Sequence, residues 1–326
     1  MKTFNQYLDI VNEAIGNIKD RYPKQPVDLY APVFYTMSLG GKRLRPVLML
    51  MACEAVGGKA GDALIPAVGL ELFHNFTLLH DDLMDRADVR RGKPTVYRKW
   101  NDNVAVLSGD AMLTMATQHI ARARAEVLSP VMDLYNKTAM EIYEGQQWDM
   151  DFEDRDDVKV EEYLEMIRLK TSVLLGCACK MGAILGGASK ATADDFYRLG
   201  VNVGLAFQLQ DDVLDVWGDP ETFGKATGGD IMNNKKTFLL INAINMAAGD
   251  DAQELRRWID AADAKPEEKI PAVTAIYEKL GLRQLSELYI ESFSNHALET
   301  LNAMRIDVEA KEAFHALIVK LIKRDR

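Results

Sequence analysis

Residues 72–85 read LFHNFTLLHDDLMD, and their pattern is typical of a buried helix. Its apolar positions recur at helical spacing, at Leu72, Phe76, Leu79 and Leu83. Asp81 and Asp85 lie four residues apart and therefore on one face of the same helix. Two carboxylates this close together, in apolar surroundings, raise each other's pKa unless a cation lies between them. The stretch predicts a buried helix that ends in a cation site.

A second acidic pentad, DDVLD, occupies residues 211–215. The apolar stripe that leads into it consists of Leu205, Leu209 and Val213. Asp211 and Asp215 again share one helical face. Oxygen ligands of this kind suit magnesium, which binds carboxylates together with water and substrate phosphates. Two such clusters facing one another would hold a diphosphate from both sides.

Helical periods recur along the rest of the chain, and signals for strands and hairpins are almost absent. A third apolar stripe, near the C-terminus, consists of Phe314, Leu317 and Leu321. We expect a single all-α domain over residues 1–326, with the two acidic helices at its centre. No repeat of solenoid period interrupts it.

Local signals predict where some segments begin and end. Thr192 and Asp195 have the spacing of a capping box that opens the helix of the second pentad, and residues 218–220 (GDP) close that helix. The charge run of residues 149–157 is typical of a solvated loop or helix end. Residues 250–269 are polar and contain proline, which favours a surface connection.

The composition narrows the functional class. Hydrophobic residues make up 48% and charged residues 27% of the chain, which is typical of a globular protein. A net charge of −10 argues against non-specific binding of nucleic acid. The three cysteines form no disulfide framework or metal-ligand spacing, which favours a reducing compartment. No apolar signal core or membrane-spanning run is found, so we expect a cytoplasmic protein that does not insert into membranes.

Two basic segments complement the carboxylates. Residues 40–46 read GGKRLRP and present Lys42 and Arg45, and Arg90 and Arg91 follow the first pentad. Guanidinium groups bind phosphate oxygens in pairs, and lysine adds a point charge. Alone, either segment is typical of an exposed face; together with the pentads they form the set that a phosphate chain needs.

His74 lies two helical turns before Asp81, so it is either a site residue or a hydrogen-bonded core histidine. Gly224 and Lys225 do not form a phosphate loop, because the second glycine spacing fails and Ala226 replaces the serine or threonine.

Taken together, these segments resemble the trans-isoprenyl diphosphate synthases, the polyprenyl synthetase family. The motifs that carry the resemblance follow one another in the family's order over about residues 40–240: GGKRLRP, LLHDDLMD, RRGKPT, Lys170-Thr171, FQLQDDVLD, GKATGGD and NKKT. The resemblance implies an all-α isoprenoid synthase fold, with helices around a central cavity, that works as a homodimer. It also implies head-to-tail (1′-4) addition of isopentenyl diphosphate to an allylic diphosphate (dimethylallyl, geranyl or farnesyl), with release of diphosphate.

The resemblance assigns roles to individual residues. The residues that would hold isopentenyl diphosphate are Lys42, Arg45, His74 and Arg91. Those that would bind magnesium on the allylic diphosphate are Asp81, Asp85, Asp211 and Asp215, supported by Asp82 and Asp212. Those that would contact the same diphosphate are Arg90, Lys170, Lys225 and Lys235. Thr171 and Gln208 would lie against the developing allylic cation. About three Mg²⁺ ions per active site are implied, with Mn²⁺ able to substitute.

Two further segments match the family less fully. Residues 145–149 read GQQWD and match its Gly-Gln-x-x-Asp motif, which gives Asp149 a reading beyond a solvated charge. Lys323 and Arg324 echo a basic C-terminal tail that some members fold over the site.

The residues just before the first pentad predict the product length. Phe76 lies five residues before Asp81, about 7.5 Å along the helix axis, where a large ring would close the pocket. Thr77 is small, so Phe76 is the single block. This pattern is similar to that of synthases that make geranylgeranyl diphosphate, with farnesyl diphosphate as the alternative. Ordinary core packing is the other reading of Phe76.

Other classes fit less well. Terpene cyclases share one aspartate-rich motif but usually lack the second pentad and do not need the GGKRLRP segment. A phosphohydrolase is indicated only by His80-Asp81, without further histidine ligands at convincing spacing. A non-catalytic helical partner would not need intact pentads and basic segments.

Overall fold

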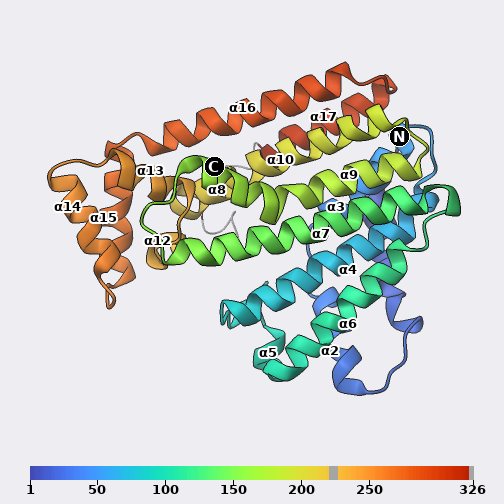
Figure 1. The fold of residues 1–326 in the computed structure, drawn as a ribbon, viewed down its shortest axis with the longest axis horizontal. Coiled ribbons are helices and arrows are strands. Elements are labelled where there is room, and N and C mark those ends of the chain that lie inside the picture. Colours follow the sequence, from blue (N-terminus) through green and yellow to red (C-terminus); the bar gives the residue numbers. More distant parts are fainter. Residues whose placement is uncertain (220–226, 323–326) are drawn as a thin grey trace. The chain divides into compact units, whose positions relative to one another are not determined.

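The computed structural model describes residues 1–219 and 227–322, and nearly all of their regular structure is helical (Figure 1). The strands found in this part of the chain are β1 (Val89–Arg90) and β2 (Lys93–Pro94), which pair antiparallel. The predicted all-α fold is therefore confirmed. The chain divides into two compact units, and the prediction of one domain over residues 1–326 stays a prediction.

Unit 1 comprises Met1–Asn136, Cys177–Phe196 and Arg305–Ala313. The elements that lie wholly within it are α1 (Phe4–Gly16), η1 (Ile18–Asp20), α2 (Val27–Ser38), α3 (Leu44–Ala55), α4 (Ala60–Met84), β1, β2, α5 (Val96–Lys99) and α6 (Asp102–Ile120).

Unit 2 comprises Lys137–Gly176, Tyr197–Met304 and the chain from Phe314 onward. The elements within it are α8 (Val160–Ile167), the π-helical turn η2 (Arg168–Ser172), α12 (Gly229–Met232), α13 (Phe238–Met246), α14 (Asp250–Asp260), α15 (Pro266–Lys279) and α16 (Leu282–Ala303). The helices that contribute residues to both units are α7 (Ala125–Glu153), α9 (Val173–Leu185), α10 (Lys190–Trp217) and α17 (Val308–Ile322).

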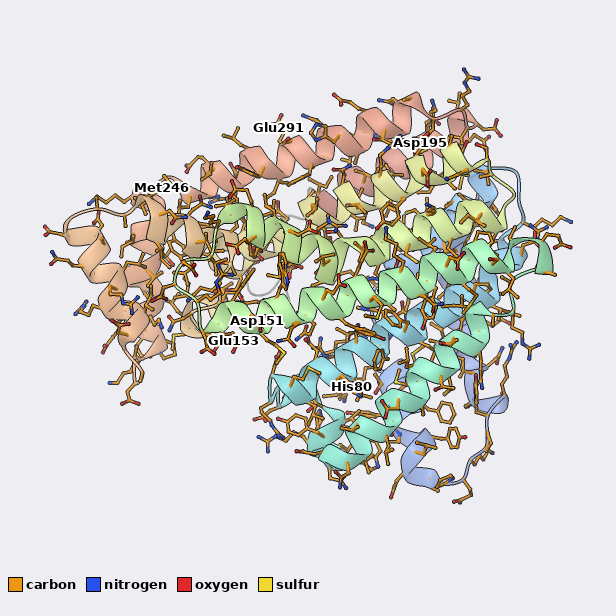
Figure 2. All side chains as sticks on the ribbon, viewed as in Figure 1. His80, Asp151, Glu153, Asp195, Met246 and Glu291 are labelled. Atoms are coloured by element: carbon orange, nitrogen blue, oxygen red, sulfur yellow. The ribbon has the colours of Figure 1, made fainter. Side chains whose placement is uncertain are left out.

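The core of unit 1 is built around α3 and α4. Nearly every residue of α3 is buried, as expected for a helix that is apolar on all sides. Helix α4 is 25 residues long and packs against both α3 and α6. Helices α4 and α6 approach closely because Gly109 has no side chain: a Cβ there would lie 2.0 Å from Nε2 of His80. Figure 2 shows His80 on α4 beside α6.

Unit 2 contains two apolar clusters. One joins α8 to α10 and α13 through residues such as Met166, Leu209 and Phe238. The other joins α12 to α16 and includes Ile231 and Tyr277. The apolar stripe that the sequence predicted before the second pentad lies in the first cluster, which fixes the end of α10.

Several local predictions are corrected. Helix α10 begins at Lys190, and Oγ of Ser189 accepts a hydrogen bond from the amide of Thr192, so the predicted box at Thr192 lies inside the helix. The predicted closure of α10 agrees with its end at Trp217, although Pro220 lies outside the described residues. Residues 250–269 form α14 and the start of α15 instead of a connection. The polar α14 buries Leu255 fully and packs the partly buried Trp258 and Ile259 against the same core cluster.

Two predictions about composition can be compared with the structure. Cys53, Cys177 and Cys179 are all free thiols and all buried. No helix in the described ranges, 1–219 and 227–322, combines the length and the apolarity needed to cross a bilayer.

Candidate active site

The first aspartate pentad lies at the C-terminal end of α4. Met84 is the last helical residue, and Asp85 is the C-cap, whose amide donates to the carbonyl of Asp81 at 2.9 Å. The spacing of one helical turn is therefore kept, as the sequence predicted. Asp85 is exposed, and the side chain of Asp81 is 20% exposed, with its Oδ1 buried.

Asp82 is buried beside Arg90. Nε and Nη2 of Arg90 each lie 2.7 Å from Oδ1 of Asp82, and Nη2 lies 3.8 Å from Oδ2 of Asp81. Burial raises the pKa of Asp82 to about 6; Arg90 opposes this shift, while Asp81 and Asp85 add to it. The pentad thus places several carboxylates together at the end of α4, and oxygen ligands of this kind suit a divalent cation.

Arg45 and His74, which the family resemblance assigned to the same substrate, meet in unit 1. Nη1 of Arg45, in the first turn of α3, lies 3.1 Å from Nε2 of His74, near the middle of α4. Burial lowers the pKa of His74 well below its ordinary value, and four arginines, led by Arg45 and Arg91, lower it further. His74 is therefore neutral, and its Nε2 can accept the proton that Arg45 donates. Lys42 is exposed in the loop before α3.

The strands β1 and β2 bring Arg91 to the same place. Arg91 and Gly92 have φ angles of 53° and 72°, which is the geometry of a two-residue type I′ turn. Nη1 of Arg91 donates to the carbonyl of Gly40, and a Cβ on Gly41 would lie 2.9 Å from Nη2 of Arg91. Glycine at position 41 therefore makes room for the guanidinium. The hairpin could not be recognised in the sequence, because its turn is Arg-Gly instead of Asn-Gly.

The predicted chain-length residues lie within α4. Phe76 is buried, with its ring centroid 5.7 Å from Phe73 and 4.8 Å from His80. Oγ1 of Thr77 donates to the carbonyl of His74 at 2.8 Å, so its small side chain is turned back onto the helix. Phe76 is therefore a single buried aromatic residue with none at position 77, and its role in setting product length stays a prediction.

The second pentad ends α10 in unit 2. Asp212 is buried and accepts hydrogen bonds from the hydroxyl of Tyr163 and from Nε2 of Gln208, the latter at 3.2 Å. Oε1 of Gln208 in turn accepts from Oγ1 of Thr171 at 3.3 Å. Burial raises the pKa of Asp212 to about 7, and Asp230 adds to this shift against the hydrogen bonds. The predicted residues Thr171, Gln208 and Asp212 therefore form one network.

Asp211 and Asp215 are partly exposed beside this network. Oδ2 of Asp215 accepts the amide of Asp230 at 3.0 Å, and the carbonyl of Asp215 accepts the amide of Gly228 at 2.6 Å. The end of α10 is thereby tied to the start of α12.

Lys170 lies on the π-helical turn η2, and its Nζ is 2.5 Å from Oδ2 of Asp149 near the end of α7. Burial alone would raise the pKa of Asp149, but Lys235 and Lys170 lower it below its ordinary value. The carboxylate of Asp149 therefore interacts electrostatically with both lysines. The charge run of residues 149–157 contains the end of α7 at Glu153, in agreement with the predicted helix end. Asp149 itself is not a solvated charge, because its carboxylate is mostly buried and pairs with Lys170.

Gly145 lets α7 and η2 approach one another. A Cβ on Gly145 would lie 2.4 Å from the backbone nitrogen of Lys170. The Gly-Gln-x-x-Asp motif thus has two structural functions. Gly145 lets the backbones of α7 and η2 come into contact, and Asp149 pairs its negative charge with Lys170.

Some residues that contact the site carry no strong signal that singled them out in the sequence. Glu71 and Asn75, in the apolar α4, and Tyr163, in α8, contact predicted site residues or their neighbours. A carboxylate at position 71, three residues before His74, was the available signal. Lys225 and the tail residues Lys323 and Arg324 lie outside the described residues.

Comparison with known proteins agrees with this arrangement. The polyprenyl synthetase family model matches residues 26–277. The chain belongs to the polyprenyl synthetase family. It is 41% identical over 283 residues to a geranylgeranyl diphosphate synthase of Methanosarcina mazei, covering 86% of this chain and 85% of that one. It is 39% identical over 254 residues to a geranylfarnesyl diphosphate synthase of Natronomonas pharaonis, covering 72% and 74%.

Among solved structures, a crystal structure of a geranylgeranyl pyrophosphate synthase resembles this polyprenyl synthetase with a TM-score of 0.94. The two are 44% identical, and the match covers 100% of both chains. The family and the enzyme class that the sequence motifs predicted, prenyltransferase, are thereby confirmed.

Proposed function

We propose that this polyprenyl synthetase condenses isopentenyl diphosphate with an allylic diphosphate in head-to-tail (1′-4) fashion and releases inorganic diphosphate. The observation that carries the proposal is the contact of Arg45 with His74, with Arg91 held on the adjoining loop. This cluster supplies a diphosphate site that contains no aspartate pentad residue. A cyclase, which binds one diphosphate, has no need for it.

The isopentenyl diphosphate site consists of Lys42, Arg45, His74 and Arg91. Guanidinium groups offer paired donors to phosphate oxygens, and neutral His74 keeps Arg45 in place without adding a positive charge. The exposed Lys42 can reach a bound phosphate as a point charge.

The aspartate pentads fit magnesium. No group of three or more ligating side chains lies close enough to hold a metal within the part of the chain that the structure describes. Each pentad instead provides two partly or fully exposed carboxylates, Asp81 with Asp85 and Asp211 with Asp215. Magnesium usually takes one or two carboxylates and completes its shell with water and substrate phosphates. When bound, it supplies positive charge that stabilises the departing diphosphate.

The allylic carbon–oxygen bond breaks first and leaves an allylic cation and a diphosphate. Lys170 and Lys235, which share the carboxylate of Asp149, stabilise the negative charge of the diphosphate, and preorganised donors of this kind are strongest where water is excluded. The hydroxyl of Thr171 and the amide oxygen of Gln208 face the positive charge. Their hydrogen bond at 3.3 Å holds both oxygens in place.

The double bond of isopentenyl diphosphate then attacks the cation, and one carbon–carbon bond forms. One proton must leave the new cation to restore a double bond. Following the family resemblance, we propose that the released diphosphate accepts it. Apolar walls protect both cations from capture by water.

We propose geranylgeranyl diphosphate as the main product, because Phe76 is a single aromatic block and the relatives at 41% and 44% identity carry that name. The relative at 39% identity is named a geranylfarnesyl diphosphate synthase, so a longer product is one alternative to test. Farnesyl diphosphate is the shorter alternative. A homodimer in the cytoplasm, with Mn²⁺ able to replace Mg²⁺, completes the proposal.

The test is incubation of the purified chain with isopentenyl diphosphate, each allylic primer and magnesium, followed by sizing of the products. A twenty-carbon diphosphate and stoichiometric inorganic diphosphate are expected. Cyclised hydrocarbon without use of isopentenyl diphosphate would indicate a cyclase, and release of monophosphate would indicate a hydrolase.

A further inference from the structure

A buried ion pair lies on the same two elements as Arg45 and His74, which we propose to bind isopentenyl diphosphate. Oε1 of Glu71 is 2.6 Å from Nη1 of Arg43, and both side chains are only 3% exposed. Glu71 lies on α4 one turn before His74, and Arg43 lies between Lys42 and Arg45. The pair therefore connects the two elements that carry the binding residues.

Arg43 has an unusual backbone. Its φ and ψ angles of 47° and 34° place it in the left-handed region, at the N-cap of α3. A residue with a side chain adopts this region only at an energetic cost, so other contacts must hold Arg43 in this conformation. Nη2 of Arg43 donates to the carbonyl of Met37 at 2.5 Å, near the end of α2. The side chain thus joins α2 and α4 while its backbone turns the loop.

Asn75 fixes Glu71 from the other side. Nδ2 of Asn75 donates to the backbone carbonyl of Glu71 at 2.8 Å and to its Oε1 at 3.1 Å. Asn75 is fully buried and next to His74. One carboxylate oxygen therefore accepts both from the loop and from α4.

The arrangement is not the one that stability alone would favour. A buried ion pair often contributes no more to stability than apolar residues of the same volume. In addition, Nε of Arg43 and Oδ1 of Asn75 are buried without a hydrogen-bond partner among the described residues, which is a further cost. Arg43, Glu71 and Asn75 are better explained by the way they fix the loop before α3 against α2 and α4.

The charge of Glu71 also acts on its neighbours. Burial lowers the pKa of Arg45 to about 10, and the charge of Glu71 opposes this shift. It likewise supports the charged form of Arg91. Because Arg43, Arg45 and Arg91 carry like charges, a buried carboxylate among them reduces their repulsion before a substrate binds.

We propose that Glu71, Arg43 and Asn75 are positioning residues, which hold Arg45, His74 and the GGKRLRP loop in the geometry that binds isopentenyl diphosphate. The inference rests on the proposed function. The three residues act through their neighbours and do not touch the substrate. Removing them should therefore weaken binding of isopentenyl diphosphate and leave the allylic substrate almost unaffected.

The main test is the double variant Arg43→Met/Glu71→Leu, which removes both charges and keeps the side-chain volumes similar. KM for isopentenyl diphosphate and for the allylic primer, together with kcat, are measured in wild type and variant. We expect KM for isopentenyl diphosphate to rise at least tenfold and KM for the allylic primer to change less than twofold. The control is Lys180→Met/Asp194→Leu, which removes a partly exposed ion pair of unit 1, with Nζ and Oδ1 2.5 Å apart. It should leave both constants unchanged.

A milder variant covers the case in which the double variant does not fold. Arg43→Lys keeps one positive charge for Glu71 but cannot also reach the carbonyl of Met37 with a second donor. We expect KM for isopentenyl diphosphate to rise severalfold at unchanged helical content by circular dichroism.

The outcomes separate the two proposals. If wild type does not consume isopentenyl diphosphate, the proposed function is wrong. If wild type is active and folded variants raise both KM values equally, or neither, the positioning role is wrong.

Discussion

Nη1 of Arg45 lies 3.1 Å from Nε2 of His74, so a permanent cation is held by a neutral imidazole. Burial and the surrounding arginines lower the pKa of His74 well below its ordinary value. The histidine therefore orients a guanidinium without competing with it for the proton. The positive charge at this place therefore comes from the arginines and not from His74 at neutral pH. The lowered pKa of His74 also makes the free energy of unfolding decrease in acid.

Replacing His74 by glutamine should reduce the loss of stability in acid. In the unfolded chain the imidazole takes up a proton near pH 6.5, while in the folded chain it does so only at lower pH. The unfolded state thus binds more protons below pH 6.5, and each such group costs up to about 1.4 kcal/mol per pH unit as the pH falls. Glutamine does not titrate, so this contribution disappears.

The measurement is the urea midpoint of wild type and His74→Gln at pH 7.5, 6.5 and 5.5. The control is His296→Gln, at an exposed position on α16, which should keep the pH dependence of wild type. An unchanged slope in His74→Gln would contradict the prediction. Some slope will remain, because the pKa of His119 is also lowered, first by burial.

The aspartates of the pentads should be needed for turnover and not for folding. Asp81→Ala or Asp211→Ala removes a partly exposed carboxylate, and we expect kcat to fall by orders of magnitude, since charge stabilisation is expressed mainly in the transition state. Circular dichroism and steady-state rates at several magnesium concentrations test this. Asp110→Ala, an exposed aspartate of α6, is the control. Near-normal turnover in a folded pentad variant, or activity in excess chelator, would argue against magnesium binding there.

Asp149→Asn should weaken the cluster of Lys170 and Lys235. The carboxylate lies 2.5 Å from Nζ of Lys170, and its lowered pKa shows that both lysines stabilise its charge. Asparagine keeps the shape but leaves the two cations to repel each other. We expect kcat to fall about tenfold or more, as when a preorganised charge is disturbed. Asp151→Asn, two residues further on and exposed, should behave as wild type; equal effects of both variants would show a general effect on α7.

Much of the site was predictable because its residues follow helical periods. The one-turn spacing of Asp81 with Asp85, and the place of His74 on the same helix, need only the regular geometry of α4. Contacts that depend on irregular backbone were not predictable. Arg91 reaches Gly40 through a type I′ turn, and η2 presents Lys170 from a π-helical turn, for which no periodic pattern exists.

Buried polar residues were missed for a related reason. Glu71 lies in a nearly continuous apolar stretch, where a sequence pattern cannot show which distant residue balances its charge. Its partner Arg43 is 28 positions away and has a left-handed backbone. The prediction for residues 250–269 was wrong for the opposite reason. Helix α14 has one fully buried residue, Leu255, so its composition is as polar as that of a loop.

The last prediction concerns Phe76 and the product length. Its ring packs on Phe73 and His80, so truncation to alanine removes one side of this aromatic group and opens space beside α4. We expect Phe76→Ala to shift the product distribution beyond twenty carbons, with a stability cost of about 3–5 kcal/mol from the lost packing. The products are sized by chromatography after dephosphorylation. Phe196→Ala, which removes a fully buried ring elsewhere in unit 1, is the matched control and should be destabilised without a change in product length. A folded, active Phe76→Ala variant that makes the same products as wild type would show that Phe76 is ordinary core packing.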